Sequence, residues 1–198
     1  MFMKMNSMIN NFSVVIPVFN EEEIFLESAD KIFNICQEMN IPFEIIFSEN
    51  GSLDNTKNLI HAFIEDKDNC FMINSNYANY GLALKKGFEI AKNDVVISFD
   101  IDYFSKKFLK QSLKLDENYV ALVASKRLNE SEDERTFIRK MATSIFVSIL
   151  KLLFQTSLSD THGMKAIRRY NIQKEINNVI STQVSKISCV DITLFISF

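Results

Sequence analysis

Two aspartates separated by one residue follow an apolar, strand-like run in the segment VVISFDIDYFS, residues 95–105. Asp100 and Asp102 occupy alternate positions, so both carboxylates are expected on the same side of a strand end. Carboxylate oxygens suit hard divalent cations, and a pair of them leaves coordination positions open for phosphate oxygens. A cation held there would neutralise charge on a departing diphosphate. Because Asp-x-Asp is also common by chance, the alternative interpretation is a solvated loop.

The elements that would position this pair are apolar runs alternating with helical patterns. Strands are predicted at 12–18, 43–48, 70–74, 94–99 and 119–125, and apolar residues with helical spacing lie between the first four. Such alternation predicts right-handed crossovers and an open, mostly parallel α/β sheet covered by helices on both faces. Ligands of such sheets bind beyond the carboxyl ends of the strands. We therefore expect the functional residues directly after each strand.

All four of the first strand exits are polar, and three carry acidic residues. Their sequences are PVFNEEE (17–23), SENGSLDNT (48–56), NSNYANYG (74–81) and DIDYFS (100–105). An acidic, amide-rich sheet edge is what a site for a sugar, a nucleotide and a cation would need.

Composition favours one globular domain that spans residues 1–198. The chain is 47% hydrophobic and carries a net charge of −3, which argues against a nucleic-acid partner because phosphate neutralisation needs clustered Lys and Arg. Three widely spaced cysteines, Cys36, Cys70 and Cys189, predict reduced thiols in a cytoplasmic protein. We expect no export signal and no membrane span. The apolar segment 141–154 is interpreted as a buried helix, with a helix on a membrane surface as the alternative.

Five segments resemble glycosyltransferase family 2 enzymes of GT-A (Rossmann-like) fold, in order and spacing. They are VVIPVFNEEE, EIIFSENGSLDNT, NYGLALKKGFEIAKNDVVISFDID, SKR and DTHGMKAIRR. The resemblance covers residues 12–193 and is strongest to dolichyl-phosphate or polyprenyl-phosphate sugar synthases. It implies a nucleotide-sugar half at about 12–103 and an acceptor half at about 104–198. Relatives usually continue into further helices, so the chain is expected to be truncated at its C-terminus.

The resemblance implies an inverting glycosyltransferase that moves a sugar from a UDP- or GDP-linked donor to a polyprenyl or dolichyl phosphate. The chain would then work in the cytoplasm, at the cytoplasmic face of a membrane through peripheral association, and no oligomeric state is indicated. A lipid phosphate is already an anion, so positioning and charge stabilisation would carry most of the catalysis. A saccharide acceptor in surface polysaccharide synthesis is one alternative. It would need a carboxylate base such as Asp160 or Asp191.

The family's nucleotide-sugar contacts map onto the first strand exits. Pro17, Phe19 and Glu21 match positions that hold the base and ribose, and Gly81 lies in the matching segment before the fourth strand.

Glu49 and Asn50 match a pair that is usually Asp-Asp and contacts the base, so this pair leaves the choice of nucleotide open. Ser52 is expected to cap the next helix, which is compatible with a nucleotide loop.

The metal site implied by the resemblance consists of Asp100 and Asp102 with Mg²⁺ or Mn²⁺. In the lipid-phosphate branch a glutamine often follows two residues later, where this chain has Phe104. The departures at Asn50 and Phe104, together with Thr193 in place of an acid, motivate a third alternative, a non-catalytic nucleotide-sugar-binding remnant.

Basic and acidic residues of the second half are expected near the phosphates and the acceptor. Lys126 and Arg139 match phosphate-contacting positions, although the alternative is a solvated face on which arginines balance acidic neighbours. Asp160, in DTHGMK, matches a segment near the acceptor. His162 could titrate near neutral pH but is more typical of a structural residue beside a turn.

Overall fold

A computed structural model describes residues 9–116, 119, 121–124 and 164–172 of the chain. The strands are β1 (Phe12–Val18), β2 (Phe43–Glu49), β3 (Cys70–Asn74), β4 (Val95–Ser98), β5 (Ala121–Val123) and β6 (Lys165–Arg168). The helices are α1 (Phe25–Gln37), α2 (Thr56–Ile64), α3 (Tyr80–Ile90) and α4 (Lys106–Ser112). Every predicted strand is present, although the strand expected at 119–125 is only three residues long.

The six strands form one sheet in the order β3-β2-β1-β4-β6-β5. The first four are parallel, whereas β6 is antiparallel to β4 and β5 is antiparallel to β6. This confirms the open, mostly parallel sheet. A further strand, β6, lies between β4 and β5 and follows Gly163 closely in the sequence.

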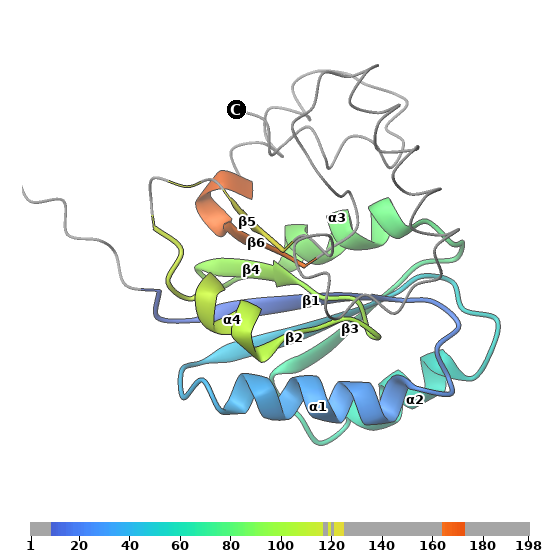
Figure 1. The fold of residues 1–198 in the computed structure, drawn as a ribbon. Helices are drawn as coiled ribbons and strands as arrows, with labels where there is room; N and C mark the ends of the chain where they lie inside the picture. The colour runs from blue at the N-terminus through green and yellow to red at the C-terminus, as the bar shows by residue number, and fades with distance from the viewer. Residues whose placement is uncertain (1–8, 117–118, 120, 125–163, 173–198) are drawn as a thin grey trace, which may run out of the picture.

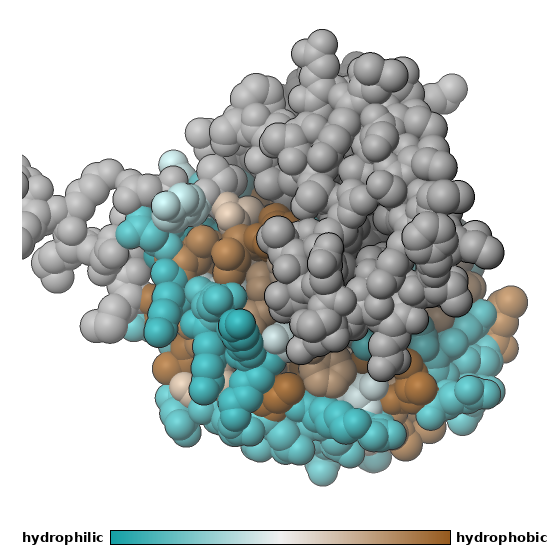
Figure 2. Space-filling model, in the orientation of Figure 1, coloured by the Kyte–Doolittle hydropathy of each residue, from teal (hydrophilic) through white to brown (hydrophobic). Residues whose placement is uncertain are grey.

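Helices cover both faces of the sheet, as Figure 1 shows. One apolar core joins the sheet to α1, α2 and α4, and a second joins it to α3. All seven residues of β1 are buried, as expected for a central strand covered on both sides. The outer surface of the described part near α1 is mostly hydrophilic (Figure 2).

Apolar side chains at helical spacing form the buried face of α1. Phe25, Ala29, Ile32 and Cys36 recur every three or four residues and are all buried. The Phe25 ring packs edge-on against the Phe47 ring of β2, with centroids 5.2 Å apart. Aromatic contacts of this geometry add to the burial of apolar area and fix the helix on the sheet.

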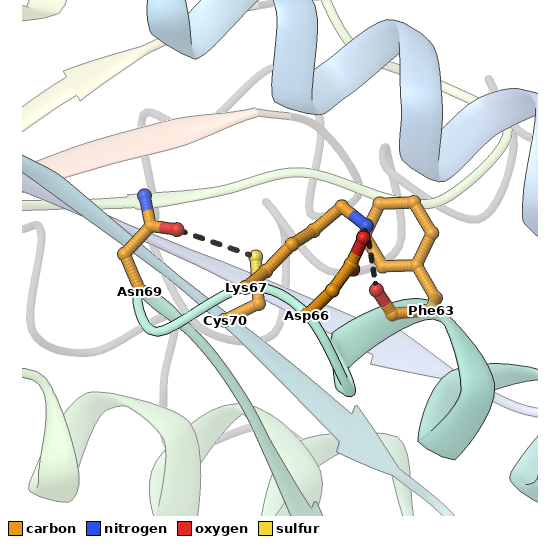
Figure 3. Close-up of polar contacts among 5 residues, drawn as sticks. All are labelled: Phe63, Asp66, Lys67, Asn69 and Cys70. Carbon is orange, nitrogen blue, oxygen red and sulfur yellow. Dashed lines mark hydrogen bonds and ion pairs between the residues drawn. The ribbon is translucent and has the colours of Figure 1, made fainter.

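Lys67 closes the turn between α2 and β3 (Figure 3). Its Nζ donates a hydrogen bond to the carbonyl oxygen of Phe63 at 2.8 Å and pairs with Asp66 at 2.7 Å. The same ammonium lies 4.4 Å from the centroid of the Phe63 ring. Satisfying the last carbonyls of α2 in this way ends the helix and starts β3 at Cys70.

No helix in the described ranges has both the length and the apolar character needed to cross a membrane. The expected buried helix at 141–154 lies outside those ranges.

Candidate nucleotide-sugar and metal site

The sheet opens at its carboxyl end between β1 and β4. Pairing between these strands ends at Val15 and Ser98, whereas β1 stays paired with β2 as far as Val18 and Glu49. The chain goes from β1 to β2 on one side and returns with β4 on the other, which makes this the topological switch point where α/β sheets bind ligands. Pro17, which has no N–H to donate, lies in the part of β1 beyond its pairing with β4.

Acidic residues from three strand exits gather at this opening, where three aspartates act on Glu21. The pKa of Glu21 lies above its usual range, first because the carboxyl group is partly buried and then because Asp102, Asp54 and Asp100 add negative charge. The sequence-predicted residues Glu21, Asp100 and Asp102 are therefore brought into electrostatic contact. Asp54 was not predicted.

The Asp100–Asp102 pair lies in a turn and not on a continuing strand. The N–H of Asp100 donates to the carbonyl of Tyr103 at 3.2 Å, and the N–H of Tyr103 donates back at 3.0 Å. Ile101 is buried in the core, and Asp102 is exposed. We expected the alternation of side chains along a strand to align the two carboxylates. Instead, β4 ends at Ser98, and the turn after it positions both groups.

A divalent cation fits the chemistry of this turn. Among the described residues, no three His, Cys, Asp or Glu side chains form a ready-made metal site. Asp100 and Asp102 offer only oxygen ligands, which Mg²⁺ and Mn²⁺ favour, and both add negative charge near the partly buried Glu21, which a cation would offset. These two carboxylates are therefore the residues that would hold the metal, with the other ligands supplied by phosphate and water.

Hydrogen bonds join the β1 exit to the β2 exit. The N–H of Asn20 donates to the hydroxyl of Ser52 at 3.0 Å, and the side-chain oxygen of Asn20 accepts from the N–H of Leu53 at 2.8 Å. Further along, the N–H of Glu21 donates to the hydroxyl of Thr56 at 2.8 Å. We call these three bonds the loop bridge. They show that Ser52 does not cap a helix as expected: α2 begins at Thr56, and the Ser52 hydroxyl binds the neighbouring loop.

Glu49 and Asn50 are buried at the floor of the site, 1% and 5% exposed. An oxygen of Glu49 accepts from the N–H of Ser52 at 2.5 Å, and the side-chain oxygen of Asn50 accepts from the N–H of Asn79 at 2.7 Å. Gly51, which directly follows Asn50, has a φ of 76°. A Cβ at this position would come within 2.9 Å of the backbone nitrogen of Tyr77. This strand exit is therefore pressed against the connection between β3 and α3.

The remaining predicted positions lie around this floor. Phe19 is 39% exposed directly after β1, and Gly81 is the second residue of α3. The Phe104 ring lies 6.5 Å from the Phe99 ring, so the position that often carries glutamine in the family is occupied here by apolar packing.

The acceptor side is largely outside the described residues, including Lys126, Arg139, Asp160, His162 and Asp191. Their roles remain predictions.

Lys165 from the same motif is described: it starts β6, is buried, and pairs with Ser98 at the end of β4. Lys165 therefore lies beside the carboxyl end of β4, next to the candidate site.

Sequence analysis did not identify Asn20, Asn79 and Tyr80 as site residues. Asn79 caps α3 by accepting from the N–H of Leu82 at 3.0 Å, and the hydroxyl of Tyr80 donates to Oδ1 of Asp100 at 2.8 Å. The available signal was an Asn immediately before an apolar helical pattern at a strand exit.

Comparison with known proteins identifies the family. The profile described as Glycosyl transferase family 2 matches residues 13–176, so the chain belongs to this family. Undecaprenyl-phosphate 4-deoxy-4-formamido-L-arabinose transferase of Serratia proteamaculans is 29% identical over 174 residues, covering 85% of this chain and 52% of the relative. The Proteus mirabilis protein of the same name is 28% identical over 170 residues, covering 83% and 51%. The chain thus spans about half the length of these relatives.

Solved structures confirm the GT-A fold. Mannosyltransferase PcManGT from Pyrobaculum calidifontis, in complex with GDP-Man and Mn²⁺, has a TM-score of 0.57 at 18% identity, covering 84% of this chain and 46% of the other. Glucosyl-3-phosphoglycerate synthase from Mycobacterium tuberculosis, in complex with Mn²⁺, UDP and phosphoglyceric acid, has a TM-score of 0.58 at 17% identity, with coverage of 87% and 65%.

Proposed function

We propose that this chain transfers a sugar from a nucleoside-diphosphate donor to the phosphate of a polyprenyl or dolichyl lipid, with inversion at the anomeric carbon. The observation that carries the proposal is the opening between β1 and β4, where strand exits gather acidic residues and where partial burial, followed by the charges of Asp102, Asp54 and Asp100, raises the pKa of Glu21. Family membership, the lipid phosphate in the names of the relatives, and the nucleotides bound by the structural neighbours support it.

The residues at the opening have complementary tasks in this proposal. Pro17, Phe19 and Glu21 at the first exit, with Glu49 and Asn50 on the floor, bind and orient the base and ribose of a UDP- or GDP-linked donor, and Gly81 lies at the start of α3 beside them. Asp100 and Asp102 hold Mg²⁺ or Mn²⁺, which supplies charge neutralisation to the diphosphate.

Transfer requires one bond to form and one to break. An oxygen of the lipid phosphate attacks the anomeric carbon from the face opposite the diphosphate, and the bond to the diphosphate oxygen breaks with its electron pair. Because the phosphate is ionised at neutral pH, no side chain has to remove a proton. Catalysis then depends on alignment of the two substrates and on stabilisation of the departing charge. Lys126, Arg139 and Asp160 are the residues we propose for the acceptor side.

The substitution Asp102→Asn tests the donor and metal site. The wild type should show a higher melting temperature with UDP- or GDP-sugar plus Mn²⁺ than with either alone, and should transfer radiolabelled sugar to polyprenyl phosphate. Asp102→Asn should lose both effects, because the amide cannot replace the charged oxygen ligand. Asp30→Asn on the exposed surface of α1 is the matched control and should behave as the wild type. Full transfer by Asp102→Asn would refute the proposal.

A second substitution addresses the acceptor. Lys126→Ala should raise the KM for the lipid phosphate more than the KM for the donor, because we assign Lys126 to the binding of the acceptor phosphate. Equal changes in both would contradict that role. Donor binding by the wild type without any transfer would favour the non-catalytic alternative, and transfer to a saccharide but not to the lipid would favour polysaccharide synthesis.

A further inference from the structure

A phenol from α3 binds one of the two candidate metal carboxylates. The hydroxyl of Tyr80 donates a hydrogen bond to Oδ1 of Asp100, with 2.8 Å between the oxygens. Tyr80 is the first residue of α3 and Asp100 lies in the turn after β4, so the bond joins the start of this helix to the exit of the fourth strand. Tyr80 is 37% exposed, which places it at the boundary between the protein and the opening.

The start of α3 is itself fixed to the sheet. The N–H of Asn79 donates to the buried side chain of Asn50 at 2.7 Å, and the N–H of Asn50 donates to the carbonyl of Val18 at 2.9 Å. Further along the helix, Gly87 packs directly on Val15 of β1. The phenol therefore projects from a helix start that is tied to the ends of β1 and β2.

The two aspartates differ in how they are held. Asp100 is fixed by two backbone hydrogen bonds to Tyr103 and by the phenol of Tyr80. Asp102 is exposed at the tip of the same turn. Hydrogen bonds to a ligating carboxylate fix its orientation before the metal arrives, and loss of such an outer partner costs about 10- to 100-fold in metal affinity or activity.

We propose that Tyr80 is a positioning residue for the metal site: it holds Oδ1 of Asp100 and thereby fixes the orientation of the carboxylate that would hold the divalent cation. The inference rests on the proposed function, because it takes Asp100 as a metal ligand. Tyr80 does not itself contact the metal in this arrangement. It lowers the entropic cost of ordering Asp100 when the cation and the diphosphate bind.

Tyr80→Phe removes the hydroxyl and keeps the ring. Mn²⁺ affinity is measured by electron paramagnetic resonance titration of the full chain with saturating UDP and, in a parallel series, with GDP. We expect Mn²⁺ binding about 10-fold or more weaker than in the wild type. Nucleotide affinity without metal and the melting temperature of the metal-free protein should not change. Tyr77→Phe, at a residue 62% exposed on the same connection, is the matched control and should bind Mn²⁺ like the wild type.

The outcomes separate this inference from the function on which it rests. Equal Mn²⁺ affinity for Tyr80→Phe and wild type would overturn the positioning role and leave the proposed function intact. A wild type that binds no Mn²⁺ with either nucleotide would overturn both. If Tyr80→Phe lowers the melting temperature and weakens metal-free nucleotide binding as much as Mn²⁺ binding, the residue is merely structural and the inference is wrong.

Discussion

Asn20 after β1 accepts a hydrogen bond from the backbone N–H of Leu53 after β2, with 2.8 Å between nitrogen and oxygen. Asn20 also has a φ of 54°, in the left-handed region that Asn tolerates better than most residues. Its own N–H donates to the hydroxyl of Ser52. One residue thus combines an unusual backbone conformation with two bonds of the loop bridge, which fixes the first two strand exits against each other.

Two substitutions at Asn20 separate the side-chain bond from the backbone conformation. Asn20→Gly loses the bond to Leu53 but suits the positive φ, so it should lower the free energy of unfolding by about 1 kcal/mol. Asn20→Ala loses the bond and adds left-handed strain, for a total of about 2 kcal/mol. Urea denaturation measures both, and donor affinity should fall in the same order. Equal stability of the Ala and Gly variants would show that the conformation contributes nothing.

The raised pKa of Glu21 predicts a pH-dependent stability. Burial and the neighbouring carboxylates raise the pKa of Glu21 in the folded protein above its ordinary value of 4.5. The folded protein therefore binds the proton of Glu21 more tightly than the unfolded chain does. The stability that this proton contributes is fully present below pH 4.5 and is lost as pH rises through the pKa of Glu21 in the folded protein. Relative to Glu21→Gln, the metal-free wild type should therefore become less stable as pH increases above 4.5, until Glu21 is ionised in the folded protein as well.

Urea denaturation at several pH values checks this expectation. Glu23→Gln, in the same exposed acidic segment, removes one charge of the same sign and serves as the control. A constant difference between wild type and Glu21→Gln across the pH range would mean that neither burial nor the neighbouring carboxylates raise the pKa of Glu21 in the folded protein.

Sequence patterns were sufficient to predict the parallel strands and the polar exits where the site lies. Apolar runs mark buried strands directly, and their alternation with helical patterns predicts parallel pairing, although the order of the strands was not predicted. The contacts within the site, in contrast, could not be predicted from local sequence patterns. Tyr80 meets Asp100 only because α3 crosses over β1, and Asn20 meets Ser52 only because two loops lie side by side.

Local spacing cannot reveal such pairs, because each depends on how the elements pack. The same limitation explains why Ser52 was misassigned: a Ser just before a helical pattern is typical of a cap, yet here a loop 32 residues away competes for its hydroxyl. The insertion of β6 beside β4 likewise depends on pairing between distant segments.

Buried thiols predict slow chemical modification. Burial raises the pKa of Cys70 to about 12, and it raises the pKa of Cys36 as well, with a further contribution from nearby Cys70. Thiolates are the reactive species, so both should resist Ellman's reagent at pH 8 in the folded protein. With Cys189→Ser as background, two thiols should react rapidly in concentrated urea and neither in buffer. Rapid reaction in buffer would contradict the burial of Cys36 and Cys70.

Close packing of α3 on β1 depends on Gly87. A Cβ at this position would lie 2.3 Å from Cγ1 of Val15, a fully buried side chain in a central strand. Overpacking in Gly87→Ala should therefore lower the free energy of unfolding by about 1–3 kcal/mol. The higher helix propensity of Ala offsets roughly 1 kcal/mol of this loss. A displaced α3 would also carry Tyr80 away from Asp100, so Mn²⁺ affinity should fall together with stability.

A double-mutant cycle with Val15→Ala isolates the contact. Val15→Ala alone should destabilise the protein by leaving a cavity, but it also removes the Cγ1 atom that an alanine at 87 would strike. Gly87→Ala should then cost less in the Val15→Ala background than in the wild type, and the metal affinity should recover in parallel. If the losses of stability were additive, residues 15 and 87 would not be in conflict in the Gly87→Ala variant. That result would mean that α3 shifts freely on the sheet.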